Sequence, residues 1–114
     1  MASSLSSIRN PEEFGRDLDI ANEIVRQLGG TARLKLMIRA RNFSSIPSGV
    51  TFSFSGSRKF THVRITLQDD LYNLHFYKIR STKLLDEKTI SMVYAENLRA
   101  VFEETAERAL GGTV

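Results

Sequence analysis

Two stretches of the chain alternate apolar and polar side chains in phase with each other, and this match constrains the fold more than any other feature. They cover residues 61–67 and 72–77 and are joined by Asp69-Asp70. A tight turn at the aspartates would pair apolar with apolar and polar with polar residues at every rung, as a half-buried antiparallel hairpin requires. The predicted rungs are Leu67–Tyr72, Ile65–Leu74 and Val63–Phe76 on one face, and Thr66–Asn73, Arg64–His75 and His62–Tyr77 on the other.

Two earlier stretches, residues 33–41 and 50–55, show the same period of two and are separated by a loop that contains Pro47 and Gly49. Because side chains alternate between the two sides of a strand, each stretch predicts a strand with one apolar face. The apolar positions are Leu34, Leu36, Ile38, Ala40, Val50, Phe52 and Phe54. Residues 78–89 are ambiguous and fit an extension of the fourth strand, an edge strand or a loop.

Helical signals flank the strands on both sides. Asn10-Pro11 followed by two glutamates is a good helix start, although Gly15 favours a short turn with the helix restarting near Asp17. The pair Gly29-Gly30 ends this helix, whose apolar face is Leu18, Ala21, Ile24, Val25 and Leu28. A second helix is predicted from near Ser91 to Gly111-Gly112, with Tyr94, Leu98, Val101 and Phe102 on its apolar face.

The element order α-β-β-β-β-α predicts a two-layer α+β domain, with a four-stranded antiparallel sheet and both helices on one face. A chain of 114 residues suits one domain with a single core. We expect residues 10–112 to form that domain and residues 1–9 to be a disordered leader. The second sheet face is then open to water or to a partner.

Composition excludes several kinds of chemistry. The chain has no cysteine, which excludes disulfides and removes the main ligand of common zinc sites. No apolar run approaches the roughly 18 residues of a membrane helix, and the N-terminus lacks the apolar region of a signal peptide. We therefore expect a cytoplasmic protein that does not associate with membranes. No phosphate-binding glycine loop or nucleophile motif occurs, so we expect no cofactor, no metal and no enzymatic activity.

Positive charge is concentrated in the middle of the chain. Residues 31–80 carry nine Lys and Arg against two Asp, a net +7, whereas residues 1–30 (three against five) and 81–114 (four against six) each sum to −2. The expected sheet and helices should therefore differ in sign. A basic face suits nucleic acid, because counterions released from the phosphates supply much of the binding free energy.

The predicted nucleic-acid interface is the open sheet face with the loop that follows the second strand. Of the aromatic residues, only Tyr77 clearly points to this face, so phosphate contacts should dominate over base stacking. The predicted contact residues are Arg33, Lys35, Arg39, Arg41, Arg58, Lys59, Arg64 and Tyr77. This mode of binding allows a homodimer. The competing interpretation is a solvated sheet face whose Lys and Arg prevent edge-to-edge association.

A weaker alternative is a small hydrolytic site made by His62, Arg64, His75 and Tyr77, since His and Tyr exchange protons and Arg can hold an anion. The nearest acids are those of the Asp69-Asp70 turn, so the cluster lacks a carboxylate partner. A surface hydrogen-bonding cluster is the favoured interpretation.

Several short strings resemble a group of small, uncharacterised proteins of bacteriophages, prophages and plasmids. The strings are Gln27–Gly30, Ala40–Phe43, Val63–Leu67, Val93–Ala95 and Phe102–Thr105. The resemblance implies a mobile-element origin, where DNA binding and interference with host proteins are both common. It also implies a small residue where Arg39 stands, which makes Arg41 the more dependable contact.

The alternative function is a protein-interaction module, such as a phage-encoded modulator of a host protein, whose basic face docks an acidic surface. At fold level, four strands followed by a helix are also similar to the small single-stranded-DNA-binding coactivator and Whirly-type folds. No motif accompanies that similarity, and a fold alone does not fix a function.

Overall fold

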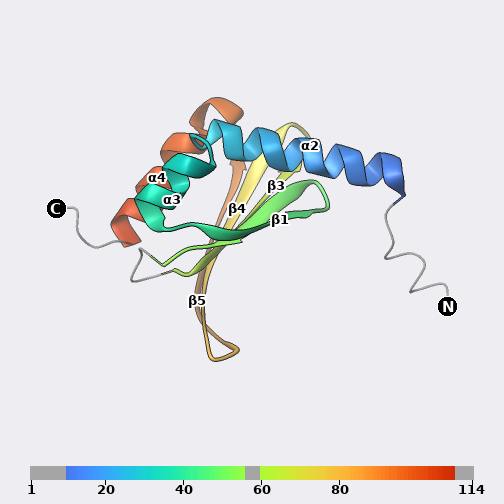
Figure 1. The fold of residues 1–114 in the computed structure, drawn as a ribbon. Coiled ribbons are helices and arrows are strands. Elements are labelled where there is room, and N and C mark those ends of the chain that lie inside the picture. The colour runs from blue at the N-terminus through green and yellow to red at the C-terminus, as the bar shows by residue number, and fades with distance from the viewer. Residues whose placement is uncertain (1–9, 56–59, 110–114) are drawn as a thin grey trace.

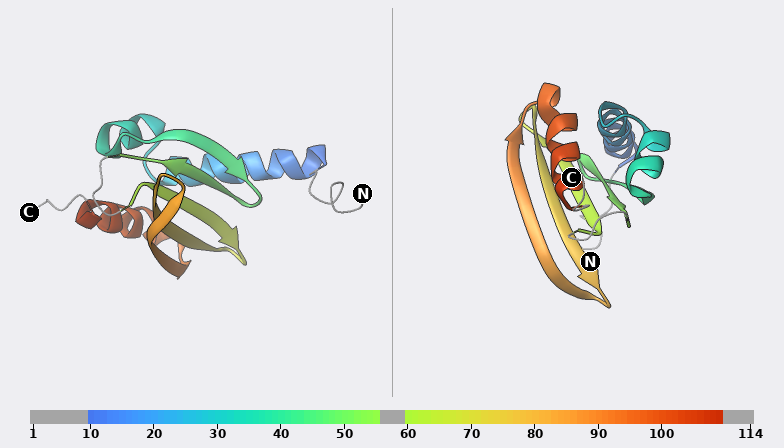
Figure 2. Two further views of the ribbon diagram at one scale, coloured as in Figure 1. Left: turned by 90° about the horizontal axis from the view of Figure 1, so that it is seen from below. Right: turned by 90° about the vertical axis from the view of Figure 1, so that its left-hand side faces the viewer.

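The structure is a computed structural model that describes residues 10–55 and 60–109, with only the backbone for residues 107–109. In this part of the chain, one antiparallel sheet of order β1-β2-β3-β4-β5 has its helices on one face (Figure 1, Figure 2). The elements are α2 (Pro11–Gln27), α3 (Thr31–Ile38), β1 (Arg41–Ile46), β2 (Gly49–Ser53), β3 (His62–Gln68), β4 (Leu71–Arg80), β5 (Lys83–Val93) and α4 (Ala95–Ala109).

The predicted α+β class with one antiparallel sheet is confirmed. The predicted count of four strands and two helices is wrong, because the described residues form five strands and three helices. The expected leader at residues 1–9 and the Gly111-Gly112 helix stop lie outside the described residues.

Helix α2 begins where its capping signals predict. The Asn10 side chain accepts a hydrogen bond from Glu13 N at 2.8 Å, and the Glu13 carboxylate accepts one from Asn10 N, which completes a capping box. Pro11 occupies the first helical position, where its missing N–H leaves no bond unmade. The expected interruption at Gly15 is wrong, because the glycine cost of about 1 kcal/mol is small beside the packing of the whole helix.

The buried face of α2 is turned slightly from the predicted one. Ala21 and Ile24 are buried, whereas Leu18 is 42% exposed and Asp17 is buried instead. An Asp17 carboxylate oxygen accepts a hydrogen bond from Ser48 N at 2.9 Å. A backbone donor thus satisfies the buried carboxylate and ties α2 to the turn between β1 and β2.

The stretch that we expected to form the first strand is mostly a helix. In α3, Leu34 and Ile38 are buried, and Leu36 is 87% exposed. Burial four residues apart is the spacing of one helix side, whereas a strand would have buried Leu36 as well. Gly29 and Gly30, with φ of 113° and 95°, turn the chain from α2 into α3. Packing within the helical layer therefore overrides the two-residue alternation.

Helix α3 ends at a residue with a left-handed backbone conformation, and β1 begins two residues later. Arg39 has φ of 56° and ψ of 45°, and Ala40 N donates to Leu34 O at 3.3 Å. This is a common way to satisfy the last carbonyls of a helix. Strand β1 starts at Arg41, near the end of the strand that we expected, and a bulge follows between Arg41 and Ser44.

The predicted hairpin is confirmed rung for rung. Strands β3 and β4 pair from His62 opposite Tyr77 to Leu67 opposite Tyr72, in the register that the alternation predicts. Asp69 and Asp70, with φ of 52° and 66°, form the connection. Positive φ at both central residues is typical of the tight hairpin turn whose twist matches the strands.

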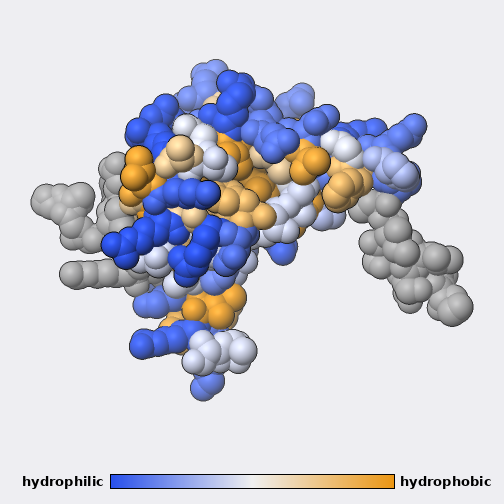
Figure 3. Space-filling view, in the orientation of Figure 1, coloured by the Kyte–Doolittle hydropathy of each residue, from blue (hydrophilic) through white to orange (hydrophobic). Residues whose placement is uncertain are grey.

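Strands β4 and β5 continue past the end of β3 as a projecting arm, which we define as residues 78–86. They are joined at Ser81-Thr82, where φ is again positive, at 51° and 68°. The arm extends away from the sheet in Figure 1, and Figure 3 shows apolar surface on it. The ambiguous residues 78–89 therefore prolong β4 and form most of the edge strand β5.

The core lies between the helices and one sheet face. Phe102 of α4 packs against Phe52 and Phe76, with ring centroids 6.0 Å and 5.8 Å apart. Leu98 is buried on the same side of α4, as predicted, whereas Tyr94 precedes the helix and is 61% exposed. Burial of each large side chain contributes about 1.5–3 kcal/mol, so this cluster is the main stabilising contribution.

Two leucines test the helical assignment of α3. We expect Leu34→Ala to lower the free energy of unfolding by about 2–5 kcal/mol, because it leaves a cavity in the core. Leu36→Ala should change it by less than about 0.5 kcal/mol, since the side chain is already in water. Chemical denaturation of both variants measures the difference, and equal losses would contradict the helix.

Candidate nucleic-acid interface on the open sheet face

The sheet face opposite the helices, which we call the open face, carries two rows of cross-strand neighbours. Paired residues point to the same side of a sheet, so each row forms a band across the strands. The first row is Arg41, Ser53, His62, Tyr77 and Glu87, and the second is Thr51, Arg64, His75 and Thr89. No helix of residues 10–55 and 60–109 covers this face (Figure 2).

Three ring side chains lie side by side at the centre of the open face. The His62 and Tyr77 rings are stacked, with centroids 5.2 Å apart and planes 13° apart. The His75 ring centroid is 5.3 Å from that of Tyr77, with the two planes tilted by 38°. The sequence predicted all three residues on this face, and the confirmed register brings the two imidazoles next to the Tyr77 ring. The face therefore offers a continuous ring surface.

The carboxylate that the histidine cluster was expected to lack is supplied by β5. Glu87 lies opposite Tyr77, and its Oε1 is 2.8 Å from His75 Nε2. The Glu87 and His75 side chains are 55% and 38% exposed, so this is a hydrogen bond at the surface that orients the imidazole. Sequence reasoning missed Glu87 because the strand that carries it was not assigned. No alternation marked this strand, because Asp86 and Lys88 on either side of Glu87 are also charged.

His62 contributes an uncharged ring at neutral pH. Burial lowers the pKa of its imidazole, and the positive charge of Arg41 lowers it further. Its Nδ1 lies 2.7 Å from Thr61 Oγ1, which holds the ring in place. A neutral imidazole is suited to stacking and hydrogen bonding.

A hollow of about 310 Å³ lies where the open face meets the arm. Its lining comes from three strands and combines a cation, two rings and two aliphatic side chains. The lining residues are Arg64 of β3, His75, Tyr77 and Ile79 of β4, and Leu84 of β5. Its volume is at the lower end of the range of about 300–1,000 Å³ for small-molecule sites.

The structure divides the predicted contact residues into three groups. Arg41, Arg64 and Tyr77 are on the open face, where we expected them. Arg33, Lys35 and Arg39 are not, because α3 replaces the expected strand and carries them into the helical layer. Arg58 and Lys59 lie outside the described residues. The continuous basic stripe predicted on the first strand is therefore wrong.

Arg33 has a structural role in the helical layer. Its Nη2 is 3.1 Å from an oxygen of Glu103 on α4, and Arg99 Nε is 3.0 Å from the same oxygen. Burial opposes the charge of Glu103, but the hydrogen bonds from Arg99 and Arg33 outweigh it, and the pKa of this carboxyl is lowered. The shared carboxylate links α3 to α4.

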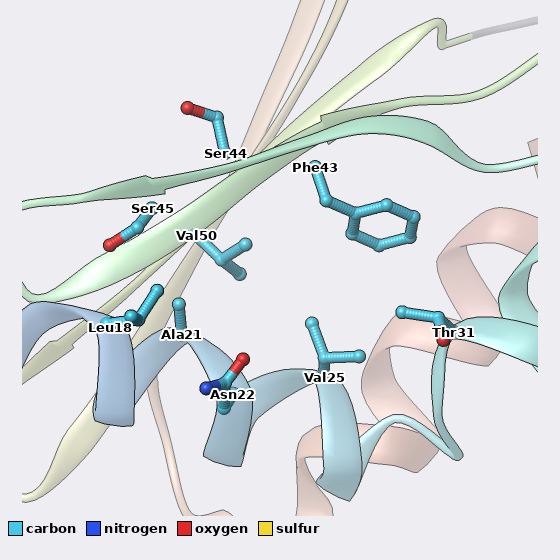
Figure 4. A pocket seen from close by; sticks show the side chains of 9 residues that line it. All are labelled: Leu18, Ala21, Asn22, Val25, Thr31, Phe43, Ser44, Ser45 and Val50. Atoms are coloured by element: carbon cyan, nitrogen blue, oxygen red, sulfur yellow. The ribbon is translucent and has the colours of Figure 1, made fainter.

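A second concave region, an apolar groove of about 210 Å³, lies between α2 and the edge strand β1 (Figure 4). Val25 and Val50 face each other across it, and Phe43 closes one side. None of the described residues that line it is charged, so these residues offer nothing to neutralise a phosphate. The cations and rings that suit a nucleic acid are on the opposite side of the sheet.

Among residues 10–55 and 60–109, no three His, Asp or Glu residues are grouped so as to hold a metal ion. In the same residues, no helix is both long and apolar enough to span a bilayer. Comparison with protein-family models, with curated proteins and with solved structures gives no match.

The link between α3 and α4 predicts a pH-dependent stability. The pKa of Glu103 is lower in the folded than in the unfolded chain. Its contribution to the free energy of unfolding is therefore complete above the pKa of the unfolded chain, and it is lost as the pH falls through the pKa of the folded chain. Glu103→Gln should lower the free energy of unfolding by about 1 kcal/mol at pH 7. Denaturation at pH 7 and pH 3 should show this gap narrowing in acid, and a constant gap would contradict the prediction.

Proposed function

We propose that the protein is a non-enzymatic domain that binds nucleic acid through its open face. The observation that supports this most strongly is the cluster of the His62, Tyr77 and His75 rings in the same two cross-strand rows as Arg41 and Arg64. Rings supply flat surfaces for bases, and arginines supply charge for phosphates.

The distribution of charge favours the same surface. Helix α2 carries five acids against two arginines, a net −3, on the opposite side of the sheet. Beyond the open face, the arm adds Arg80 and Lys83, both exposed and paired next to its turn. A nucleic-acid strand is therefore repelled from α2 and attracted to the path from Arg41 and Arg64 to the arm.

We expect binding that weakens steeply with salt. If Arg41, Arg64, Arg80 and Lys83 each neutralise one phosphate, the log–log slope of affinity against salt should be about −2.8 for single strands. Fluorescence anisotropy with labelled single- and double-stranded DNA and RNA at several salt concentrations measures it. A flat salt dependence would contradict binding through phosphates.

Two variants that reverse one charge each test whether the open face or α3 binds the nucleic acid. Arg64→Glu should weaken binding by about tenfold or more and reduce the slope by about 0.7, because one cationic contact is lost. Lys35→Glu makes the same change of charge on α3 and should leave both quantities nearly unchanged. Equal effects would argue for attraction by net charge alone. Far-UV circular dichroism establishes that both variants are folded.

A specific observation on α3 favours a second candidate, a protein-interaction module. Leu36 is 87% exposed, and Lys35 and Arg39 are exposed beside it. An apolar side chain between two cations suits an acidic protein surface with an apolar centre. In a pull-down from nuclease-treated lysate, a stoichiometric partner that Leu36→Asp loses and Arg64→Glu retains would favour this function.

A further inference from the structure

We propose that the hollow at the root of the arm holds one unpaired base of a single-stranded nucleic acid, with a neighbouring phosphate on Arg64. This inference rests on the proposed function and adds the kind of strand that the site selects. The evidence for it is the set of side chains from β3, β4 and β5 that line the hollow.

The two aliphatic residues of the hollow are exposed because they lie beyond the end of β3. Ile79 and Leu84 are opposite each other on the arm and are 38% and 54% exposed. No third strand of the described chain packs against them, since β3 starts at His62 opposite Tyr77. Their apolar surface is adjacent to the ring surface of the open face and extends it toward the arm.

The lining matches the chemistry of a nucleobase and its phosphate. A base has flat, weakly polar faces, which the Tyr77 ring and the two aliphatic side chains can contact. Its edges carry hydrogen-bond donors and acceptors, which the Tyr77 hydroxyl and the His75 ring can meet. Arg64, which also lines the hollow, can hold the adjoining phosphate through two parallel hydrogen bonds.

The root of the arm is held in place, so that the hollow is formed before any ligand binds. Thr61 N donates to Tyr77 O at 2.9 Å, and Ile79 N donates to Thr61 Oγ1 at 3.0 Å. Glu87 fixes the His75 ring from β5. A preformed site loses little conformational entropy on binding.

Only an unpaired base can enter this hollow. The faces of bases inside a duplex are covered by their neighbours, and a duplex would have to be opened to free one. A duplex can still make the phosphate contacts of the open face. The inference therefore predicts a preference for single strands that depends on the bases and not on the phosphates.

The chain offers a matched pair of variants for the test. Leu84 and the next residue, Leu85, are 54% and 51% exposed, but only Leu84 lines the hollow. We would measure the affinity of the full chain and of Leu84→Ser and Leu85→Ser for a labelled thymidine strand, for an abasic strand of equal length and for a duplex.

We expect the wild-type protein to bind the thymidine strand about tenfold more tightly than the abasic strand, since stacking on one base has about that effect. Leu84→Ser should abolish most of this difference without changing affinity for the abasic strand, and Leu85→Ser should leave it intact. Equal affinity for thymidine and abasic strands, or equal losses in both variants, would overturn the inference.

If Arg64→Glu still weakened salt-dependent binding, the proposed function would stand. Absence of binding to every strand at low salt would overturn both.

Discussion

The packing of Phe102 between Phe52 and Phe76 determines how the two layers of this domain meet. The three rings are fully buried and come from α4, β2 and β4, so the contact spans the centre of the sheet. Helices α2 and α3 lie beside α4 on the same face (Figure 1). The three helices of the described residues therefore all lie on one face of the sheet. The polar side chains on the other side remain accessible for the same reason that the phenylalanines are buried.

The parts of the fold that sequence predicts well are those where two patterns have to agree. The β3–β4 register follows from alternation in both strands, because a slip of one residue would bury Arg64 and expose Ile65. The start of α2 follows from Asn10 and Glu13, whose side chains cap it. Strand β5 carries no such pattern. Of its residues only Val93 is fully buried, so most of the strand lacks the apolar row that marks the others.

The candidate site is predictable only as far as the strands that carry it. Arg64 and Tyr77 belong to the hairpin and lie on the open face. Arg41 also lies on this face, although it is the first residue of β1 and we expected it near the end of a strand. The stretch before Arg41 satisfies two periods at once, because Leu34 and Ile38 fit a strand face and a helix side equally well. The exposure of Leu36 distinguishes them, and exposure depends on tertiary contacts. Glu87 reaches the site only through a strand that pairing with β4 creates.

The order of the strands has a consequence for how the chain folds. Each strand pairs with the one that precedes it, so the whole sheet can grow by successive hairpins, whose longest connection is the eight residues 54–61. The entropic cost of closing such loops is small. Two contacts of α4 join segments that are far apart in the sequence, namely the packing of Phe102 on Phe52 and the ion pair of Arg33 with Glu103. The docking of α4 is therefore the step that brings the two ends of the described domain together, and it depends on closing longer loops than the hairpins do.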